Sequence, residues 1–215
     1  MPMSIANLRK DYTQGELSES SVDSDPIRQF RLWFDQALTS QLLEPNAMTL
    51  ATALPSGEVS ARIVLLKGFD ERGFVFFSNY LSRKAHEIDE NPHAALLFFW
   101  AELERQVRIE GTTERVDAAD SDTYFASRPL GSRLGAIASP QSQVIPSRTP
   151  LEEKMAELQR QYADGNVPRP PHWGGTRVIP TQIEFWQGRP SRLHDRIRYR
   201  KCPTTHAWII ERLAP

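Results

Sequence analysis

The chain has 215 residues, of which 40% are hydrophobic, so it can bury the core of one large domain or two small ones. Its 26 basic and 27 acidic residues give a net charge of −1, which argues against general binding to nucleic acids or anionic membranes. The single cysteine, Cys202, excludes an intrachain disulfide and a cysteine-based zinc site. The five histidines are scattered, so no metal site is predicted.

Residues 1–24 are polar and show no regular hydrophobic pattern, so we expect a mobile or ligand-ordered arm. They contain no apolar segment or cleavage pattern typical of a signal peptide. The longest apolar run, residues 94–101, is far shorter than the ~20 residues that a membrane-spanning helix needs. We therefore expect a soluble, cytoplasmic protein in which residues 25–215 form a single domain.

The first regular element is a helix that begins at Asp25 and Pro26. Asp is a favoured N-cap residue, and Pro suits the first helical position. Spacings of three and four residues then place six apolar side chains on one face: Ile27, Phe30, Trp33, Phe34, Ala37 and Leu38. This stripe is typical of a helix that packs on a hydrophobic core.

Residues 48–111 change to the pattern of β-strands. Strands are predicted at 48–53, 59–67, 74–79, 94–100 and 105–111, with a short helix after Ser82. Five strands joined by short turns indicate a closed or partly closed antiparallel barrel.

The remainder of the chain alternates helices with loops and then returns to strands. Helices are predicted at 117–127 and 132–138, and a third begins at Thr149 with the pattern of a capping box and is closed by Gly165. Strands at 178–186, 192–199 and 207–213 complete the sheet. The predicted fold class is therefore mainly β with flanking helices.

Three side chains with affinity for anions recur at every second position near the C-terminus: Arg192, His194 and Arg196. In a β-strand they project from one face. Two guanidiniums beside an imidazole suit a phosphate or a carboxylate, which Arg binds in a bidentate manner. The alternative is a solvated strand face.

Other cations occur at Arg62 and Lys67 on one predicted strand, at Arg83 and Lys84 at a helix start, and at Arg128 after another helix. Arg62 and Lys67 fall on opposite faces of a regular strand, so the strand must bend if both serve one site. Cations at a helix N-terminus reinforce an anion site, although an exposed basic turn is the alternative. In a nearly neutral chain these clusters would suit two phosphate-bearing ligands, yet no dinucleotide-binding, Walker A or G-x-S-x-G motif is present.

Eight short motifs follow one another along the chain: Arg-Ile-Val-Leu-Leu-Lys at 62–67, Ser-Arg-Lys-Ala-His at 82–86, Glu-Arg-Gln-Val at 104–107, Tyr-Phe-Ala-Ser-Arg-Pro at 124–129, Trp-Gly-Gly at 173–175, Ile-Glu-Phe-Trp-Gln-Gly at 183–188, Arg-Leu-His-Asp-Arg at 192–196 and Arg-Leu-Ala-Pro at 212–215. In order and spacing they resemble the pyridoxamine 5′-phosphate oxidase family, flavin enzymes that make pyridoxal 5′-phosphate. The resemblance runs from about Leu8 to Pro215, and Arg-Leu-His-Asp-Arg together with Trp-Gln-Gly is its most specific part. Two residues depart from the family pattern: Glu44 replaces an expected Asp, and Phe77 replaces a common Tyr.

The resemblance implies an FMN-binding split β-barrel and a homodimer whose two active sites are built at the interface from both chains. It implies these FMN contacts: Arg62, Ile63, Val64, Leu65, Leu66, Lys67, Phe77, Ser78, Arg83, Lys84, Gln106, Gln141, Ser142, Trp186 and Arg196. It implies these substrate contacts: Lys67, Tyr124, Arg128 and Ser132 at the phosphate, Arg192 and His194 over the ring as catalytic residues, and Arg9 and Tyr12 in an N-terminal segment that closes over the substrate.

The implied reaction is the oxidation of pyridoxamine 5′-phosphate or pyridoxine 5′-phosphate to pyridoxal 5′-phosphate. FMN accepts the hydride equivalent, and dioxygen reoxidises it with release of hydrogen peroxide; the amine substrate also releases ammonia. The cofactor supplies this chemistry, so the protein's tasks are placement and electrostatics.

Two other functions remain open from the sequence. Split barrels also serve as flavin- or haem-binding proteins and as enzymes that act on other rings, including phenazine precursors, which would not need the phosphate ligands Tyr124, Arg128 and Ser132. A regulator or carrier of pyridoxal phosphate would bind the vitamer without turnover.

Overall fold

The computed structural model describes residues 4–5, 8 and 10–215, and within them it contains one nine-stranded sheet and five helices. The strands are β1 (Ala47–Ala53), β2 (Val59–Leu65), β3 (Gly68–Asp70), β4 (Gly73–Asn79), β5 (His93–Trp100), β6 (Arg105–Arg115), β7 (Trp173–Gln187), β8 (Asp195–Lys201) and β9 (Trp208–Arg212). The helices are α1 (Pro26–Thr39), α2 (Arg83–Glu90), α3 (Ala118–Ser127), α4 (Leu130–Ala138) and α5 (Thr149–Gln161), and two 3₁₀ turns are η2 (Ala101–Leu103) and η3 (Pro190–Arg192). The predicted class, mainly β with flanking helices, is confirmed.

The strand order is β2-β1-β5-β6-β7-β4-β3, with β8 paired to β7 and β9 paired to β8. The chain folds as two compact units. The first unit comprises Met1–Thr49, Ala95–Gly111 and Pro180–Pro215, and the second comprises Leu50–Ala94 and Thr112–Ile179. Each unit has its own core and its own set of candidate functional residues.

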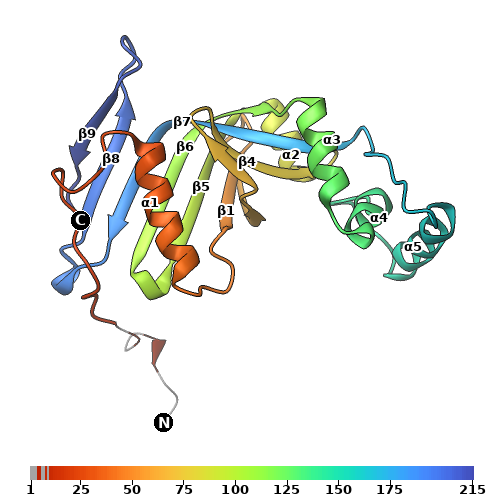
Figure 1. Ribbon diagram of the computed structural model, residues 1–215, viewed down its shortest axis with the longest axis horizontal. Coiled ribbons are helices and arrows are strands. Elements are labelled where there is room, and N and C mark those ends of the chain that lie inside the picture. Colours follow the sequence, from red (N-terminus) through yellow and green to blue (C-terminus); the bar gives the residue numbers. More distant parts are fainter. Residues whose placement is uncertain (1–3, 6–7, 9) are drawn as a thin grey trace. The chain divides into compact units, whose positions relative to one another are not determined.

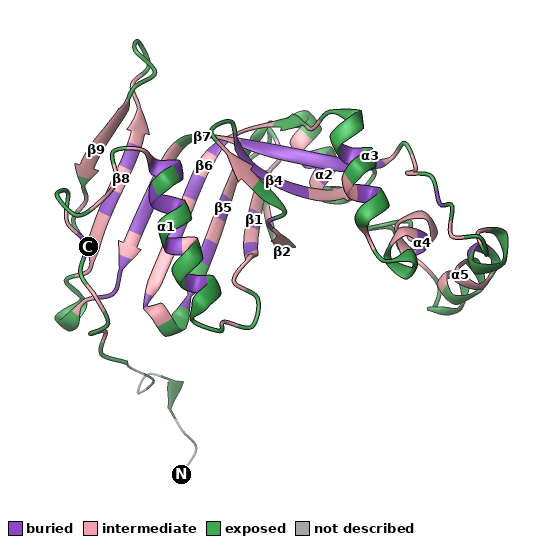
Figure 2. Cartoon of the chain, in the orientation of Figure 1, coloured by how far each residue is buried: buried purple, intermediate pink, exposed green. Residues whose placement is uncertain are grey.

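In the first unit, α1 lies across one face of the strands (Figure 1). The predicted start is confirmed, because the Asp25 carboxylate accepts hydrogen bonds from the N–H groups of Ile27, at 2.7 Å, and Arg28. Figure 2 shows the resulting division of α1 into a buried and an exposed face. Phe30 and Trp33 fill the core from the buried face.

Aromatic contacts anchor α1 to the strands beneath it. The ring of Phe30 packs 5.2 Å from Phe98 on β5, and Trp33 meets Phe185 on β7 edge to face at 5.2 Å. The prediction that Leu38 belongs to the buried stripe is wrong. This residue is turned about 100° around the helix from buried Ala37, and it is 52% exposed.

The C-terminal strands of the first unit form the antiparallel series β7–β8–β9, in which Trp186 is opposite Arg196 and Arg198 is opposite Glu211. The predicted strand at 192–199 is wrong at its start, because β8 begins only at Asp195. Residues 190–192 form a 3₁₀ turn, in which Ser191 and Arg192 have positive φ angles. A β-strand has negative φ angles, so these residues cannot belong to β8.

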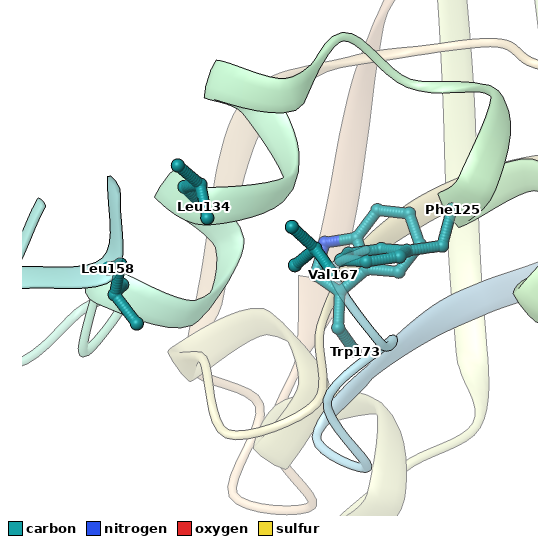
Figure 3. Close-up of a cluster of buried hydrophobic side chains, with 5 residues drawn as sticks. All are labelled: Phe125, Leu134, Leu158, Val167 and Trp173. Carbon is teal, nitrogen blue, oxygen red and sulfur yellow. The ribbon is translucent and has the colours of Figure 1, made fainter. Parts of the chain in front are cut away.

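The second unit has a separate core where α3, α4 and α5 meet the beginning of β7. Its buried side chains are Phe125, Leu134, Leu158, Val167 and Trp173. Figure 3 shows Trp173 grouped with Phe125 and Val167, and the rings of Trp173 and Phe125 lie 5.1 Å apart. This packing fixes the start of β7 relative to α3.

The predicted capping box at the start of α5 is wrong. Arg148, the residue before Thr149, already has helical backbone angles, φ −74° and ψ −24°, so the first turn begins earlier than predicted. The Glu152 carboxylate therefore pairs with Arg148 Nε at 2.8 Å and does not reach back to Thr149 as a capping box requires.

The strand predicted at 59–67 ends at Leu65, and β3 starts at Gly68. Between them the N–H of Lys67 donates to the carbonyl oxygen of Val75, at 2.8 Å. The regular strand therefore ends before Lys67. Strand β4 also pairs antiparallel with β7, in a register that places Phe77 opposite Gly175 and Asn79 opposite Trp173.

Candidate active site

The second unit contains a cavity of about 630 Å³, here called the second-unit pocket. Its walls come from the end of β2, from β4, from the first turn of α2, and from α3, α4 and the loop after α4. Eleven predicted site residues line it: Ile63, Val64, Leu65, Lys67, Phe77, Ser78, Lys84, Tyr124, Arg128, Ser132 and Gln141. The fold thus brings together residues from segments that are far apart in the sequence.

One wall of the second-unit pocket is a set of near-parallel aromatic rings. Phe77 stacks on Tyr124 with ring centres 4.0 Å apart, and Trp173 follows 5.5 Å from Phe77. Trp173 lines the pocket although it was not among the predicted site residues. The signal for it was the Trp-Gly-Gly motif. A Cβ atom at Gly175 would lie 2.9 Å from the Phe77 ring and closer still to Val116.

The guanidinium of Arg128 lies over the Trp173 ring, 4.6 Å from its centre. Its Nη1 is buried and has no hydrogen-bond partner in the described part of the chain. Burial lowers the pKa of Arg128, and the neighbouring Tyr124 opposes that shift. A buried donor without a partner is costly, and an anion that accepts its hydrogen bond recovers the cost. This geometry therefore suits a phosphate or carboxylate.

Lys84 is the second cation of the pocket, and its hydrogen-bond partners are neutral. Its ammonium donates to Ser78 Oγ at 2.9 Å, to Ser82 Oγ at 3.0 Å and to Gln141 Oε1 at 2.8 Å. Burial, and then the nearby charge of Arg62, lowers the pKa of Lys84 to about 8. The ammonium is therefore still mainly charged at pH 7. An anion in the pocket would stabilise this charged form.

Arg62 does not line the pocket, because a buried carboxylate binds it. Glu87, on α2, is 2% exposed and accepts hydrogen bonds from Thr52 Oγ1 at 2.5 Å, Ser60 Oγ at 2.6 Å and Arg62 Nη2 at 3.1 Å. Arg83 Nε also donates to it, at 2.8 Å. Burial alone would raise the pKa of Glu87, but these hydrogen bonds and the charge of Arg62 lower it to about 2.

Three other residues predicted to contact FMN lie elsewhere in the second unit. Arg83 and Ser142 line a separate cavity of about 420 Å³, to which Gln141 also contributes. Leu66 is buried, with 5% of its surface exposed, so its side chain belongs to the core.

The remaining predicted residues belong to the first unit. The ring of His194 contacts two aromatic rings, with centres 4.6 Å from that of Trp186 and 5.8 Å from that of Tyr12. These residues and Arg192 are here called the first-unit cluster. Gln106, at the start of β6, is also in the first unit and is partly buried. Arg9 lies outside the described residues.

The N–H of Arg189 donates to His194 Nδ1 at 3.1 Å, so that nitrogen carries no proton. Burial, and then the charge of Arg192, lowers the pKa of His194 below 6.5. At pH 7 the imidazole is therefore neutral, with its proton on Nε2. The chain thus presents an N–H donor at this position.

Arg192 and His194 do not project from one face of a strand, so that prediction is wrong. Ser191 and Arg192 have φ angles of +57° and +62°, which place Arg192 in the turn η3 ahead of β8. L-residues rarely adopt this conformation, and it is often found at functional sites. Arg192 is exposed, and its guanidinium has no ion pair within the described residues.

Arg196, in contrast, has protein acceptors for three of its five N–H groups. It donates to both oxygens of Glu184, at 2.8 and 3.1 Å, and to the carbonyl oxygen of Ala214. The hydrogen bonds to Glu184 raise the pKa of Arg196. The side chain of Glu184 is 1% exposed, and it also accepts from Arg108 at 2.6 Å. A single buried carboxylate thus holds two arginines.

Residues 34–162 match the family model described as pyridoxamine 5′-phosphate oxidase, and residues 173–215 match the pyridoxine 5′-phosphate oxidase C-terminal dimerisation region. The chain belongs to the pyridoxamine 5′-phosphate oxidase family. It is 61% identical over 215 residues to the pyridoxine/pyridoxamine 5′-phosphate oxidase of Trichormus variabilis, and the match covers 100% of both chains. It is 58% identical to that of Salinibacter ruber, over 98% of this chain and 99% of the relative.

Solved structures place the chain on the fold of this oxidase family. PhzG from Burkholderia lata 383, in complex with tetrahydrophenazine-1-carboxylic acid, matches with a TM-score of 0.87 and 31% identity over 93% of this chain and 98% of that one. A pyridoxamine 5′-phosphate oxidase-related, FMN-binding protein from Nostoc punctiforme matches with a TM-score of 0.68 and 18% identity over 86% and 97%, which supports the fold alone. The predicted split β-barrel and the resemblance to the oxidases are both confirmed.

The C-terminal strands β8 and β9 lie within the segment that matches the family's dimerisation region. In the part of the chain that the structure describes, no helix has the length and apolar character needed to cross a membrane.

Sequence reasoning missed the buried carboxylates of the site. Glu87 and Glu184 each bind two arginines, yet neither was predicted to have a role. Glu87 has one local signal, because Arg83 precedes it by four residues on the same helix. Glu184 lies in the motif at 183–188, but nothing local indicates its partners, because Arg108 is 76 residues away in the sequence and Arg196 is 12 residues away.

Proposed function

We propose that this chain is an FMN-dependent oxidase that converts pyridoxamine 5′-phosphate or pyridoxine 5′-phosphate to pyridoxal 5′-phosphate. Dioxygen is the electron acceptor, hydrogen peroxide is released, and the amine substrate also yields ammonia. One observation carries the proposal: the four predicted ligands of the substrate phosphate, Lys67, Tyr124, Arg128 and Ser132, all line the second-unit pocket. The names of relatives that are about 60% identical over the whole chain support the same reaction.

The residues present fit FMN, which combines a flat aromatic ring system with a phosphate. Within the described residues, the second-unit pocket has stacked aromatic rings and a lysine, Lys84, whose hydrogen-bond partners are neutral. Its volume lies in the range typical of sites for small ligands. The proposed FMN contacts are Arg62, Ile63, Val64, Leu65, Leu66, Lys67, Phe77, Ser78, Arg83, Lys84, Gln106, Gln141, Ser142, Trp186 and Arg196. When bound, FMN supplies the hydride acceptor and its reoxidation by dioxygen.

The chain's own residues supply anion binding and orientation. Lys67 and Arg128 bind the substrate phosphate through charge-assisted hydrogen bonds, and Tyr124 and Ser132 donate hydroxyl groups. The Glu87 carboxylate holds Arg62 and Arg83 in fixed positions, which reduces the side-chain entropy lost when they bind a phosphate.

The first-unit cluster is proposed to orient the substrate ring. His194, neutral at pH 7 with its proton on Nε2, donates a hydrogen bond, and exposed Arg192 adds a positive charge where charge develops in the transition state. We further propose that two chains form a homodimer. Each active site then combines the first-unit cluster of one chain with the second-unit pocket of the other.

The test is peroxide production by protein purified with FMN. We expect turnover of pyridoxamine 5′-phosphate and of pyridoxine 5′-phosphate, but not of unphosphorylated pyridoxamine at the same concentration, since the phosphate ligands then have no partner. A protein that binds no added FMN, or that oxidises phosphorylated and unphosphorylated compounds equally well, contradicts the proposal.

A second candidate is oxidation of a phenazine precursor, which the similarity to PhzG favours. Tetrahydrophenazine-1-carboxylic acid has no phosphate, so it leaves Lys67, Arg128 and Ser132 without their proposed ligand. The same peroxide assay discriminates the two candidates. Faster turnover of tetrahydrophenazine-1-carboxylic acid than of pyridoxamine 5′-phosphate would favour the second.

A further inference from the structure

We propose that Glu104 is a positioning residue: it fastens the N-terminal arm and so holds Tyr12 against His194. Tyr12 packs on Gly188, which has no side chain to displace it. The catalytic consequence of this inference rests on the proposed function. The fastening itself does not, because it is defined by contacts within the first unit.

The Glu104 side chain is bonded to the arm at adjacent residues. Its exposed fraction is 1%, and its Oε2 accepts hydrogen bonds from the backbone N–H groups of Thr13, at 2.7 Å, and Gln14, at 2.9 Å. The Lys10 ammonium lies 3.5 Å from Oε1. A buried carboxylate that accepts main-chain N–H groups forms strong, charge-assisted hydrogen bonds. The arm therefore has a specific attachment at residues 13–14.

The main chain of the same residue is bonded to the end of β7. The Glu104 carbonyl oxygen accepts from the N–H of Gly188 at 2.7 Å and from Gln187 Nε2 at 3.2 Å. Glu104 has a φ of +54°, a left-handed conformation that glutamate rarely adopts. Such a conformation persists where the surrounding contacts hold the residue in place. Here the hydrogen bonds of Glu104 connect the arm to the end of β7.

Tyr12 packs directly on the backbone of Gly188. A Cβ atom at that position would lie 2.7 Å from Tyr12 Cγ and 2.8 Å from Tyr12 Cβ, so any larger residue displaces the tyrosine. In this position the Tyr12 ring meets Trp186 edge to face at 5.7 Å and lies 5.8 Å from the His194 ring. Burial is also the main cause of the lowered pKa of His194.

These contacts give Glu104 an indirect effect on the reaction. When its hydrogen bonds are lost, the arm detaches, Tyr12 leaves the imidazole, and the first-unit cluster becomes open to water. We expect substrate affinity to suffer more than the chemical step, because Arg192 and His194 themselves are unchanged.

The experiment compares Glu104→Gln with Glu102→Gln, an exposed acid in the adjacent turn, both as FMN-loaded protein. Limited trypsin digestion followed by mass spectrometry measures the rate of cleavage after Lys10. We expect roughly tenfold faster cleavage in Glu104→Gln and no change in Glu102→Gln. With pyridoxamine 5′-phosphate as substrate, KM should rise several-fold while kcat changes by less than about twofold.

Two further variants keep the test decisive if Glu104→Gln fails to fold. Thr13→Pro removes one donor from the arm without altering the buried carboxylate, and Gly188→Ala displaces Tyr12 while leaving Glu104 in place. Both should raise the rate of cleavage or KM in the same direction as Glu104→Gln. If Thr13→Pro and Gly188→Ala are cleaved at the same rate as the wild-type protein and have the same KM, the proposal is wrong.

The trypsin readout separates this inference from the proposed function. If the wild-type protein does not oxidise pyridoxamine 5′-phosphate but Glu104→Gln is cleaved faster after Lys10, the fastening stands and the proposed function fails. If the wild-type protein is active and the variants match it in cleavage and KM, the fastening fails and the proposed function stands.

Discussion

The second-unit pocket and the first unit both contain cationic side chains, but these side chains differ in the partners that they bind. Among the described residues, Arg128 in the pocket has a buried nitrogen without a hydrogen-bond partner, and the hydrogen bonds of Lys84 go to neutral oxygens. In the first unit, Arg196 binds buried Glu184, and Arg212 binds Asp195 at 2.7 Å. A cation that already has a carboxylate partner gains less from an anionic ligand than a cation without such a partner.

The same distinction divides the Arg-Leu-His-Asp-Arg motif. Arg196 and Asp195 are bound to neighbouring strands, and they hold β8 and β9 in place. Arg192 and His194 precede the strand, Arg192 in a turn with unusual backbone angles, and the His194 imidazole accepts a hydrogen bond from the backbone N–H of Arg189. We infer that the motif combines a structural half with a reactive half.

The largest effect is expected from Arg192→Ala. If Arg192 stabilises developing charge, kcat/KM for pyridoxamine 5′-phosphate should fall roughly 10²–10³-fold, the loss typical of removing one such donor. The affinity for FMN, measured by fluorescence titration, should not change. Arg148→Ala, on an exposed turn before α5, is the control and should behave as wild type.

Glu87→Gln tests the buried carboxylate of the second unit. The pKa of Glu87 is about 2 in the folded protein, below its ordinary 4.5, so its stabilising effect is full above pH 4.5 and is lost as the pH falls towards 2. We expect Glu87→Gln to lower the free energy of unfolding by about 2–3 kcal/mol at pH 7, because Arg62 and Arg83 lose their charged partner. Denaturation in urea at pH 7 and pH 3 should show a smaller difference at pH 3, and exposed Glu90→Gln should show none at either pH.

Arg128→Ala sharpens the comparison between substrate and cofactor. Losing a charge-assisted hydrogen bond of about 1.5–3 kcal/mol should raise KM for pyridoxamine 5′-phosphate roughly 10- to 100-fold, with a smaller effect on FMN retention. Steady-state kinetics and flavin fluorescence measure the two effects. The reverse pattern, with FMN lost and KM unchanged, would favour an enzyme for unphosphorylated rings. Arg160→Ala, on the exposed end of α5, serves as the control.

The smallest effect concerns the protonation of His194. Its pKa lies below 6.5 mainly because of burial, and Tyr12 is one of the rings that surround it. Tyr12→Leu should therefore move the pKa of His194 up towards its ordinary value. Titration of the imidazole signal by NMR, assigned with His194→Gln, measures the shift. A pKa that stays unchanged in Tyr12→Leu would show that the tyrosine does not cover the imidazole.

Much of the fold followed from local patterns in the sequence. Asp25, Pro26 and the apolar stripe predicted α1, and the alternation in residues 48–111 predicted β1, β2, β4, β5 and β6 within a few residues. The failures also have local causes. Arg192 was assigned to a strand because nothing in the sequence indicates a positive φ angle at a residue other than glycine. Thr149 was predicted to be the N-cap of α5, but Arg148 occupies that position.

The sequence named candidate site residues mainly by their resemblance to a family, and it gave little sign of the carboxylates that bind other side chains. Lys67, Tyr124, Arg128 and Ser132 were predicted by resemblance, and they share one cavity. Glu87, Glu104 and Glu184 were missed because a buried carboxylate and a surface carboxylate look alike in the sequence. Their partners come from distant segments, such as Arg108 for Glu184 and Thr13 for Glu104.

The most direct test of the account is a mixed dimer of two variants. One chain carries Arg192→Ala in the first-unit cluster, and a second, differently tagged chain carries Lys67→Ala and Arg128→Ala in the second-unit pocket. If each active site combines a cluster from one chain with a pocket from the other, the mixed dimer has one intact site and should show about half the kcat/KM of the wild-type dimer. A mixed dimer no more active than either variant alone would contradict the account.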